Sequence, residues 1–299
     1  MTIAPVRLPS PLGPSYEVTW EDVEYRRDAA GQSWLARIYQ PRGTGPFPAL
    51  IEIHGGAWNT NDRTQNAPLV TALAESGLVV ASVDFRLGTQ AAYPASMADI
   101  NYATRWLKAN APRFNATADG LGGLGLSSGG HMVMLSAMRP HDPRYTELQL
   151  DSTLPNMDAS LAYVLMGWPV LAPHARYLHA RARGRADLLA SHERYFRDEA
   201  TMQEADTQLI LERGEPVELP PALIFQGADD DVLAPRTAER FVEAYGQAGG
   251  VIELAKFPRA GHGYARAAGP NALRTVDLLR SFIARQLLAM TNGYAGSGA

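Results

Sequence analysis

Gly120-Leu-Gly-Gly-Leu-Gly-Leu-Ser-Ser-Gly-Gly-His131 is the stretch of sequence that decides the fold. Its apolar first half predicts a buried strand, and its second half predicts a helix that follows a sharp turn. Within it, residues 125–129 match the pattern Gly-x-Ser-x-Gly, in which the serine occupies a strained strand-to-helix turn with its hydroxyl exposed. The two glycines are required because a Cβ atom at either place would collide with neighbouring backbone. We expect Ser127 to be the nucleophile and rank Ser128 behind it, since Leu126 would then occupy the tight position.

Composition narrows the class of protein. The chain has 299 residues, of which 46% are hydrophobic, so it can bury a large core without disulfides or metals. Its formal net charge of -4, without long basic runs, argues against nucleic acid as the main partner. The absence of cysteine excludes thiolate chemistry and cysteine-ligated zinc. No apolar run approaches the roughly 18 residues that span a membrane, and the proline-rich N-terminus does not resemble a signal peptide. We therefore expect a soluble, cytoplasmic protein.

Short apolar runs alternate with helical patterns along most of the chain. This alternation predicts an α/β fold with a mostly parallel central sheet flanked by helices, next to an antiparallel edge hairpin near the N-terminus. This alternation is absent from one charged stretch that has helical patterns and no strand pattern. We interpret that stretch as an inserted helical cap. The expected organisation is an N-terminal arm at 1–15, a core at 16–171 and 219–290, the cap at 172–218 and a flexible tail at 291–299.

Two loops after predicted strands offer a base and a carboxylate. His262 lies in a glycine-flanked loop after the last predicted strand, where an imidazole could take the proton of a serine hydroxyl. Three aspartates follow the preceding strand, and their spacing from Gly227 favours Asp230 as the group that orients the base. Asp229 and Asp231 remain alternatives, with solvation or helix capping as their ordinary roles.

The loop His54-Gly-Gly-Ala-Trp58 also follows a predicted strand. Acyl transfer requires N–H donors directed at the oxygen that becomes negative in the tetrahedral intermediate. Glycines allow the backbone to present such donors, and the start of a helix supplies another. We expect the main-chain amides of Gly55, Gly56 and Ser128 to form an oxyanion hole, with Ala57 as a further candidate.

Several aromatic and histidine residues near these loops have two interpretations. Trp58 and Trp168 leave strands on the side of the predicted site, and with Tyr93 they could form the aromatic wall of a substrate pocket. Packing in the core is an equal alternative for all three. His54 and His131 are expected to be structural, because buried polar residues at such places usually serve local hydrogen bonding.

The predicted cap is rich in arginine. These side chains could receive an anionic substrate, although charged runs more often form a solvated helix face. The residues concerned are Arg176, Arg181, Arg183 and Arg185.

Together these motifs resemble the α/β-hydrolase fold esterases, and more narrowly their hormone-sensitive-lipase-like and ferulic-acid-esterase-like branches. The resemblance covers about residues 16 to 288 outside the cap. Two departures count against the lipase-like branch, namely Ala57 in place of a third glycine and Ser128 in place of alanine. The resemblance also implies that Arg86 and Asp99 belong to a structural network beneath the site. The motifs that carry the resemblance are residues 54–58, Val83–Leu87 with Tyr93-Pro94 and Asp99, residues 125–131, residues 227–232 and Gly261-His262.

The motifs and the resemblance imply a serine carboxylesterase that hydrolyses small to medium esters through an acyl-enzyme on Ser127, without metal or cofactor. The residues are equally compatible with an amide or carbamate hydrolase, such as a kynurenine-formamidase-like enzyme or a small peptidase. Such an enzyme would use the same catalytic groups. A non-catalytic binding protein on the same fold is less favoured because no expected group is missing. The expected partner is a small-molecule ester, with neither nucleic acid nor a membrane span. The edge strand and final helix could pair two subunits as a homodimer.

Overall fold

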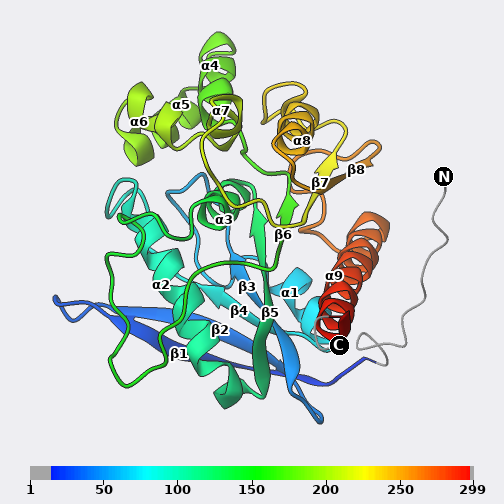
Figure 1. The fold of residues 1–299 in the computed structure, drawn as a ribbon. Helices are drawn as coiled ribbons and strands as arrows, with labels where there is room; N and C mark the ends of the chain where they lie inside the picture. The colour runs from blue at the N-terminus through cyan, green and yellow to red at the C-terminus, as the bar shows by residue number, and fades with distance from the viewer. Residues whose placement is uncertain (1–14, 297–299) are drawn as a thin grey trace.

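The computed structural model describes residues 15–296. The predicted arm at 1–15, except its last residue, and the last three residues of the predicted tail lie outside the described part. An eight-stranded sheet in the order β1-β2-β4-β3-β5-β6-β7-β8 forms the centre of the molecule (Figure 1). Its strands are β1 (Val18–Arg27), β2 (Ser33–Pro41), β3 (Phe47–Ile53), β4 (Val79–Val83), β5 (Ala116–Leu126), β6 (Tyr163–Gly167), β7 (Ala222–Gly227) and β8 (Ile252–Phe257).

Strands β1 and β2 form the antiparallel edge hairpin, and β2 pairs antiparallel with β4. The hairpin turns where the Asp28 carboxylate accepts hydrogen bonds from the amides of Ala30 and Gln32, and where Gly31 has a φ of 83°. The other neighbouring strands are parallel. This mostly parallel sheet confirms the predicted fold class.

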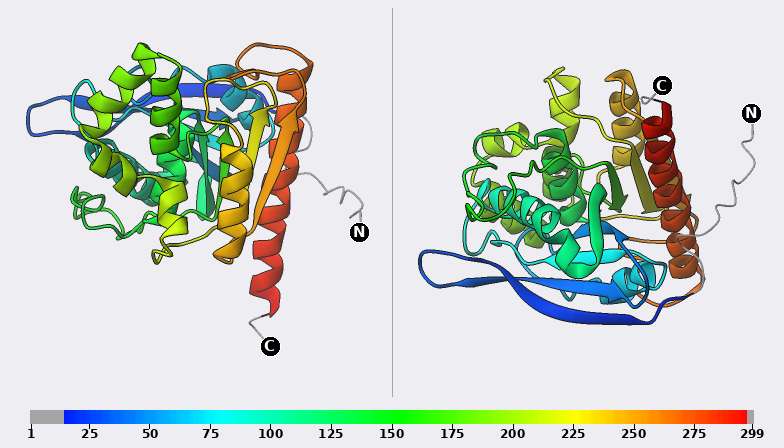
Figure 2. Two further views of the ribbon diagram at one scale, coloured as in Figure 1. Left: turned by 90° about the horizontal axis from the view of Figure 1, so that it is seen from above. Right: turned by 60° about the horizontal axis from the view of Figure 1, so that its bottom comes forward.

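Helices cover both faces of the sheet (Figure 2). Each face has its own apolar core, as expected when parallel strands are buried on both sides. All five residues of β4 and of β6 are accordingly buried. The helices are α1 (Ala67–Ala74) and α9 (Pro270–Gly296) against one core, and α2 (Ala95–Asn110), α3 (Ser128–Met138) and α8 (Thr237–Gln247) against the other.

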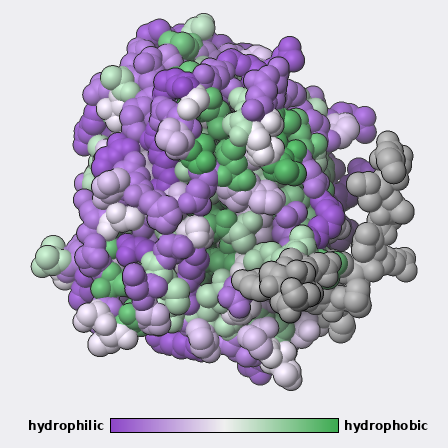
Figure 3. Space-filling view, in the orientation of Figure 1, coloured by the Kyte–Doolittle hydropathy of each residue, from purple (hydrophilic) through white to green (hydrophobic). Residues whose placement is uncertain are grey.

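Four short helices lie between β6 and β7 and occupy most of the stretch predicted as a cap (Figure 1). Asp198 and Asp206 begin two of them, and their carboxylates accept hydrogen bonds from the amides of Thr201 and Leu209. Hydrophilic residues cover much of this part of the surface, with hydrophobic patches below it (Figure 3). The helices are α4 (Pro173–Ala182), α5 (Ala186–Phe196), α6 (Glu199–Glu204) and α7 (Thr207–Glu212).

The final helix is longer than the sequence pattern indicates. It was expected to end at about Met290, whereas α9 continues to Gly296 and so includes most of the predicted tail. Although α9 has 27 residues, no helix within residues 15–296 combines the length and the apolar character needed to cross a membrane.

Candidate active site

Ser127 occupies the turn between β5 and α3 with φ 57° and ψ -118°, a left-handed backbone conformation that a serine rarely adopts. The turn is tight on both sides. A Cβ atom on Gly125 would lie 2.3 Å from the carbonyl oxygen of Gly129, and one on Gly129 would lie 2.0 Å from that of Ile53. Larger residues cannot replace either glycine without moving backbone, which explains the Gly-x-Ser-x-Gly pattern.

The structure brings Ser127, His262 and Asp230 together. The Ser127 hydroxyl donates a hydrogen bond to Nε2 of His262 at 2.9 Å, and Nδ1 of His262 donates to Oδ2 of Asp230 at 2.9 Å. The Asp230 side chain is fully buried, and its other oxygen accepts from the amide of Val232 at 3.0 Å. These contacts fix one tautomer of the imidazole, with its lone pair directed at the serine.

Sheet topology explains how residues so distant in sequence meet. Ser127, Asp230 and His262 follow β5, β7 and β8, whose carboxyl ends share one edge of the parallel sheet. The loops after β7 and β8 approach so closely that a Cβ atom on Gly227 would lie 2.1 Å from the carbonyl oxygen of Ala260. Gly227 therefore allows the aspartate loop to pack against the histidine loop.

The loop after β3 lies directly against Ser127. A Cβ atom on Gly55 would be 2.8 Å from the carbonyl oxygen of Leu126 and 3.2 Å from Cβ of Ser127. Gly56 has a φ of 116°. Among the residues that the structure describes, the amides of both glycines lack a hydrogen-bond acceptor. The Ser128 amide opens α3, where the first N–H groups have no acceptor within the helix. The expected donors thus belong to a loop packed against Ser127 and to the residue that follows it.

The side chain of Ser128 has a role that the sequence analysis missed. Its hydroxyl oxygen accepts a hydrogen bond from the main-chain N–H of Trp58 at 3.1 Å and so ties the loop after β3 to the start of α3. Ala57 and Trp58 both have left-handed backbone conformations, with φ of 49° and 64°. The only sequence signal for this contact is the second serine of the Ser-Ser-Gly run.

His54 and His131 occupy structural positions, as expected. The His54 ring stacks on Phe85 and donates to the carbonyl oxygen of Gly55 at 2.8 Å. Nδ1 of His131 accepts from the indole N–H of Trp58 at 3.2 Å, and Nε2 donates to the carbonyl oxygen of Ala205 at 2.8 Å. Burial lowers the pKa of both rings, that of His131 to about 4. Both are therefore neutral at pH 7.

The three predicted pocket aromatics are buried, which favours the packing alternative. The side chain of Trp58 is 1% exposed and stacks on Tyr195, and that of Trp168 is 0% exposed with its ring 6.3 Å from that of His262. Tyr93 is also buried and donates a hydrogen bond to Glu204 at 2.9 Å. All three side chains therefore pack in the interior of the protein.

The network implied beneath the site is present. The buried Asp99 carboxylate forms ion pairs with Arg86 at 2.8 Å and with Arg26 at 2.6 Å. Within the described part of the chain, no group of three or more histidine, aspartate or glutamate side chains is arranged to hold a metal ion.

The sheet order and the Ser-His-Asp contacts define an α/β-hydrolase. The BD-FAE family model matches residues 37–245, and the chain belongs to this family.

Relatives with esterase names share parts of the sequence. Esterase LipC of Mycobacterium tuberculosis is 27% identical over 251 residues, which are 80% of this chain and 59% of LipC. Esterase LipQ of the same organism is 22% identical over 294 residues, which are 93% of this chain and 65% of LipQ. The chain therefore spans less than two thirds of the length of these curated relatives.

Solved esterase structures share the fold. Esterase B from Lactobacillus rhamnosis superposes with a TM-score of 0.78 at 20% identity, covering 93% of this chain and 90% of that one. Esterase 2 of Thermogutta terrifontis with bound propionate has a TM-score of 0.71 at 22% identity, covering 89% and 94%.

Proposed function

We propose that the protein is a serine carboxylesterase that hydrolyses small to medium esters through an acyl-enzyme on Ser127. The single observation that carries this proposal is the pair of 2.9 Å hydrogen bonds that link Ser127 to His262 and His262 to Asp230. Serine hydroxyl is a weak nucleophile, and this arrangement is the one that activates it. The names of relatives such as Esterase LipC, and of Probable carboxylic ester hydrolase LipM over a shorter match, also support an ester substrate.

The reaction follows from the geometry. The Ser127 oxygen attacks the ester carbonyl carbon while Nε2 of His262 takes the hydroxyl proton, and Asp230 stabilises the resulting imidazolium. The amides of Gly55, Gly56 and Ser128 hold the negative oxygen of the tetrahedral intermediate. His262 then gives its proton to the departing alcohol, leaving an acyl-serine. A water molecule, deprotonated by His262, attacks this ester, and the acid leaves as Ser127 regains its proton.

Substitution of the triad tests the proposal. Ser127→Ala should remove turnover of a p-nitrophenyl ester by about 10⁴-fold or more and abolish labelling by an organophosphate. Asp230→Asn should also reduce turnover strongly, because the imidazolium loses its charged partner. Asp229→Asn and Asp231→Asn are matched controls on exposed neighbours and should leave turnover near that of the wild type. Labelling that persists at Ser128 in the Ser127→Ala protein would contradict the assignment.

An amide or carbamate hydrolase would use the same groups and differ only in the leaving group that it accepts. Matched ester and anilide substrates with a common acyl group separate the two activities. We expect the ester to be hydrolysed with the higher kcat/KM. A preference for the anilide would contradict the carboxylesterase assignment while leaving the triad in place.

The cytoplasmic location and the homodimer are also proposals. Cell fractionation tests the first. Size-exclusion chromatography with light scattering tests the second, with an edge strand of the sheet and helix α9 as the expected contact.

A further inference from the structure

One of the four cap arginines singled out from the sequence differs from the other three. Arg181 and Arg185 are at least partly exposed and form ion pairs with Glu199 and Asp187, and Arg183 is exposed. Arg176, on α4, is only 3% exposed. It is therefore the one cap arginine of this group that does not belong to a solvated helix face.

Arg176 has an incomplete set of partners. Its Nε donates to the carbonyl oxygen of Val232 at 3.3 Å, and its guanidinium lies 5.7 Å from the ring centre of Trp58. Its Nη1 is buried without a hydrogen bond, and no carboxylate of the described residues lies within 4.0 Å of its nitrogens. Buried cations are normally paired, because removing a charge from water is costly. Burial lowers the pKa of Arg176 to about 10, so it is still charged at neutral pH.

The sheet order places this guanidinium at the same edge of the sheet as Ser127. Trp58 follows β3 and Val232 follows β7, and the two strands between them in the sheet are β5 and β6. Ser127 follows β5. Arg176 approaches both Trp58 and Val232, so its guanidinium lies at the carboxyl edge of the sheet between the loops that follow β3 and β7. The negative charge of Asp230 also acts on it, which agrees with this position.

We propose that Arg176 binds a carboxylate of the substrate, and that the preferred substrates are esters that carry a carboxylate group on their acyl or alcohol part. This inference rests on the proposed ester hydrolysis at Ser127. A carboxylate would supply the partner that Nη1 lacks and would neutralise the buried charge by a charge-assisted hydrogen bond. Ser127 is itself only 5% exposed, so the serine and the guanidinium are both largely shielded from water.

Paired esters that differ only in charge test this proposal. Monoethyl succinate carries a carboxylate on its acyl part, and ethyl succinamate replaces that group by a neutral amide of similar size. O-acetylglycolate and its amide form the same pair on the alcohol part. In the wild-type protein kcat/KM should favour the carboxylate member of at least one pair by about tenfold or more. Equal values in both pairs would overturn the proposal.

The variant Arg176→Met should remove most of this preference, because methionine keeps an apolar side chain over Trp58 and loses the charge. Arg176→Lys keeps a positive charge and should retain part of the preference for the carboxylate ester. It provides the test if the methionine variant does not fold. Arg181→Met, on the same helix, is the matched control and should keep the wild-type ratio. A carboxylate preference that persists unchanged without a charge at residue 176 would refute the role of Arg176.

A binding measurement separates this inference from the proposed function. Calorimetry with monoethyl succinate and O-acetylglycolate should detect binding of at least one of them to the Ser127→Ala protein, weakened about tenfold or more by adding Arg176→Met. If the esters bind in this way but the wild type hydrolyses none of them, the proposed esterase activity fails while the anion site stands. Equal affinity with and without Arg176 would show that the anion site does not exist.

Discussion

Ser128 connects two strained pieces of backbone. Ser127 and Trp58 both have left-handed conformations, which residues other than glycine adopt only when their surroundings hold them there. The hydrogen bond from the Trp58 amide to the Ser128 hydroxyl is one such restraint, and that from the Trp58 indole to His131 is another. The side chain of Ser128 therefore holds the loop after β3 against the turn at Ser127, in addition to the amide that we propose as an oxyanion donor.

We expect Ser128→Ala to lower kcat about tenfold with little change in KM. The substitution leaves the Trp58 amide without its acceptor and loosens the donors that matter most in the transition state, which corresponds to roughly 1–2 kcal/mol. Steady-state kinetics on a p-nitrophenyl ester provide the measurement. Ser136→Ala is the control, because Ser136 is a buried serine on the same helix whose hydroxyl has no hydrogen-bond partner among residues 15–296. The activity of this variant should match the wild type. Similar kinetics for both variants would disprove the positioning role.

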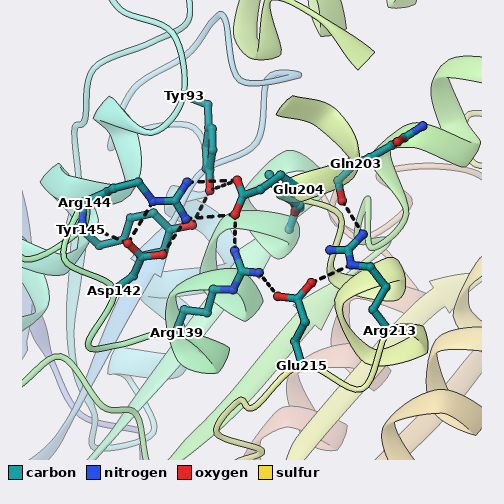
Figure 4. Close-up of polar contacts among 11 residues, drawn as sticks. Tyr93, Arg139, Asp142, Arg144, Tyr145, Gln203, Glu204, Arg213 and Glu215 are labelled. Carbon is teal, nitrogen blue, oxygen red and sulfur yellow. Dashed lines mark hydrogen bonds and ion pairs between the residues drawn. The ribbon is translucent and has the colours of Figure 1, made fainter. Parts of the chain in front are cut away.

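Helix α6 is held to the core by a network of charged groups (Figure 4). The Glu204 carboxylate accepts hydrogen bonds from Arg139, Arg144 and Tyr93, and Arg139 also pairs with Glu215 after α7. Arg139 follows α3, whereas Glu204 ends α6, so the network joins the cap to the helix that begins at the nucleophile. Asp142 and Arg213 also belong to this network. It therefore contains three carboxylates and three arginines, namely Asp142, Glu204 and Glu215 with Arg139, Arg144 and Arg213.

The variant Glu204→Gln should loosen α6. Two arginines would lose a charged partner, which should lower the free energy of unfolding by about 1–2 kcal/mol and increase amide hydrogen exchange in this helix. Hydrogen exchange with mass spectrometry can localise the change. Asp187→Asn breaks a more exposed ion pair on α5 and should change stability by less than about 0.5 kcal/mol. An α6 that exchanges at the wild-type rate would argue against the network as the attachment.

Buried titratable groups couple the stability of the whole molecule to pH. Burial raises the pKa of Glu52 to about 7 and that of Asp206 to about 6, so folding favours their protonated forms. Burial lowers the pKa of His131 to about 4 and that of His192 to about 3, so folding favours their neutral forms. The two acids lower the free energy of unfolding as the pH rises. The two histidines lower it as the pH falls below 6.5, the usual pKa of a histidine side chain.

Glu52→Gln should isolate one of these contributions. Between the usual pKa of 4.5 and about 7, the unfolded chain releases a proton that folded Glu52 retains, so wild-type stability declines as the pH rises through this range. Glutamine does not titrate, so the stability of the variant relative to the wild type should increase by up to about 3 kcal/mol from pH 4 to pH 8. Urea unfolding across this range measures the difference. Glu147→Gln, at an exposed residue, should show no comparable trend, and a flat difference for Glu52→Gln would disprove the coupling.

Local sequence determined the sheet, the nucleophile turn and the glycine loop of this protein. Gly125, Gly129 and Gly55 are required where backbone segments approach within van der Waals distance, and alternating apolar runs identify buried strands. Such signals lie within a few neighbouring residues, so they can be read without knowing how the chain packs. They also placed Ser127 and His262 after strands that end at one edge.

Only the tertiary structure decided which of several equivalent side chains faces the site. It joined His262 to Asp230, which spacing favoured without excluding Asp229 and Asp231, and it buried Arg176 while Arg181 and Arg183 are exposed. It also buried Trp58 in the core, where the sequence allowed a pocket wall as readily. The physical reason is that these outcomes depend on how the cap helices and the strand-end loops pack against one another. That packing depends on contacts between segments distant in sequence, which local composition and spacing do not encode.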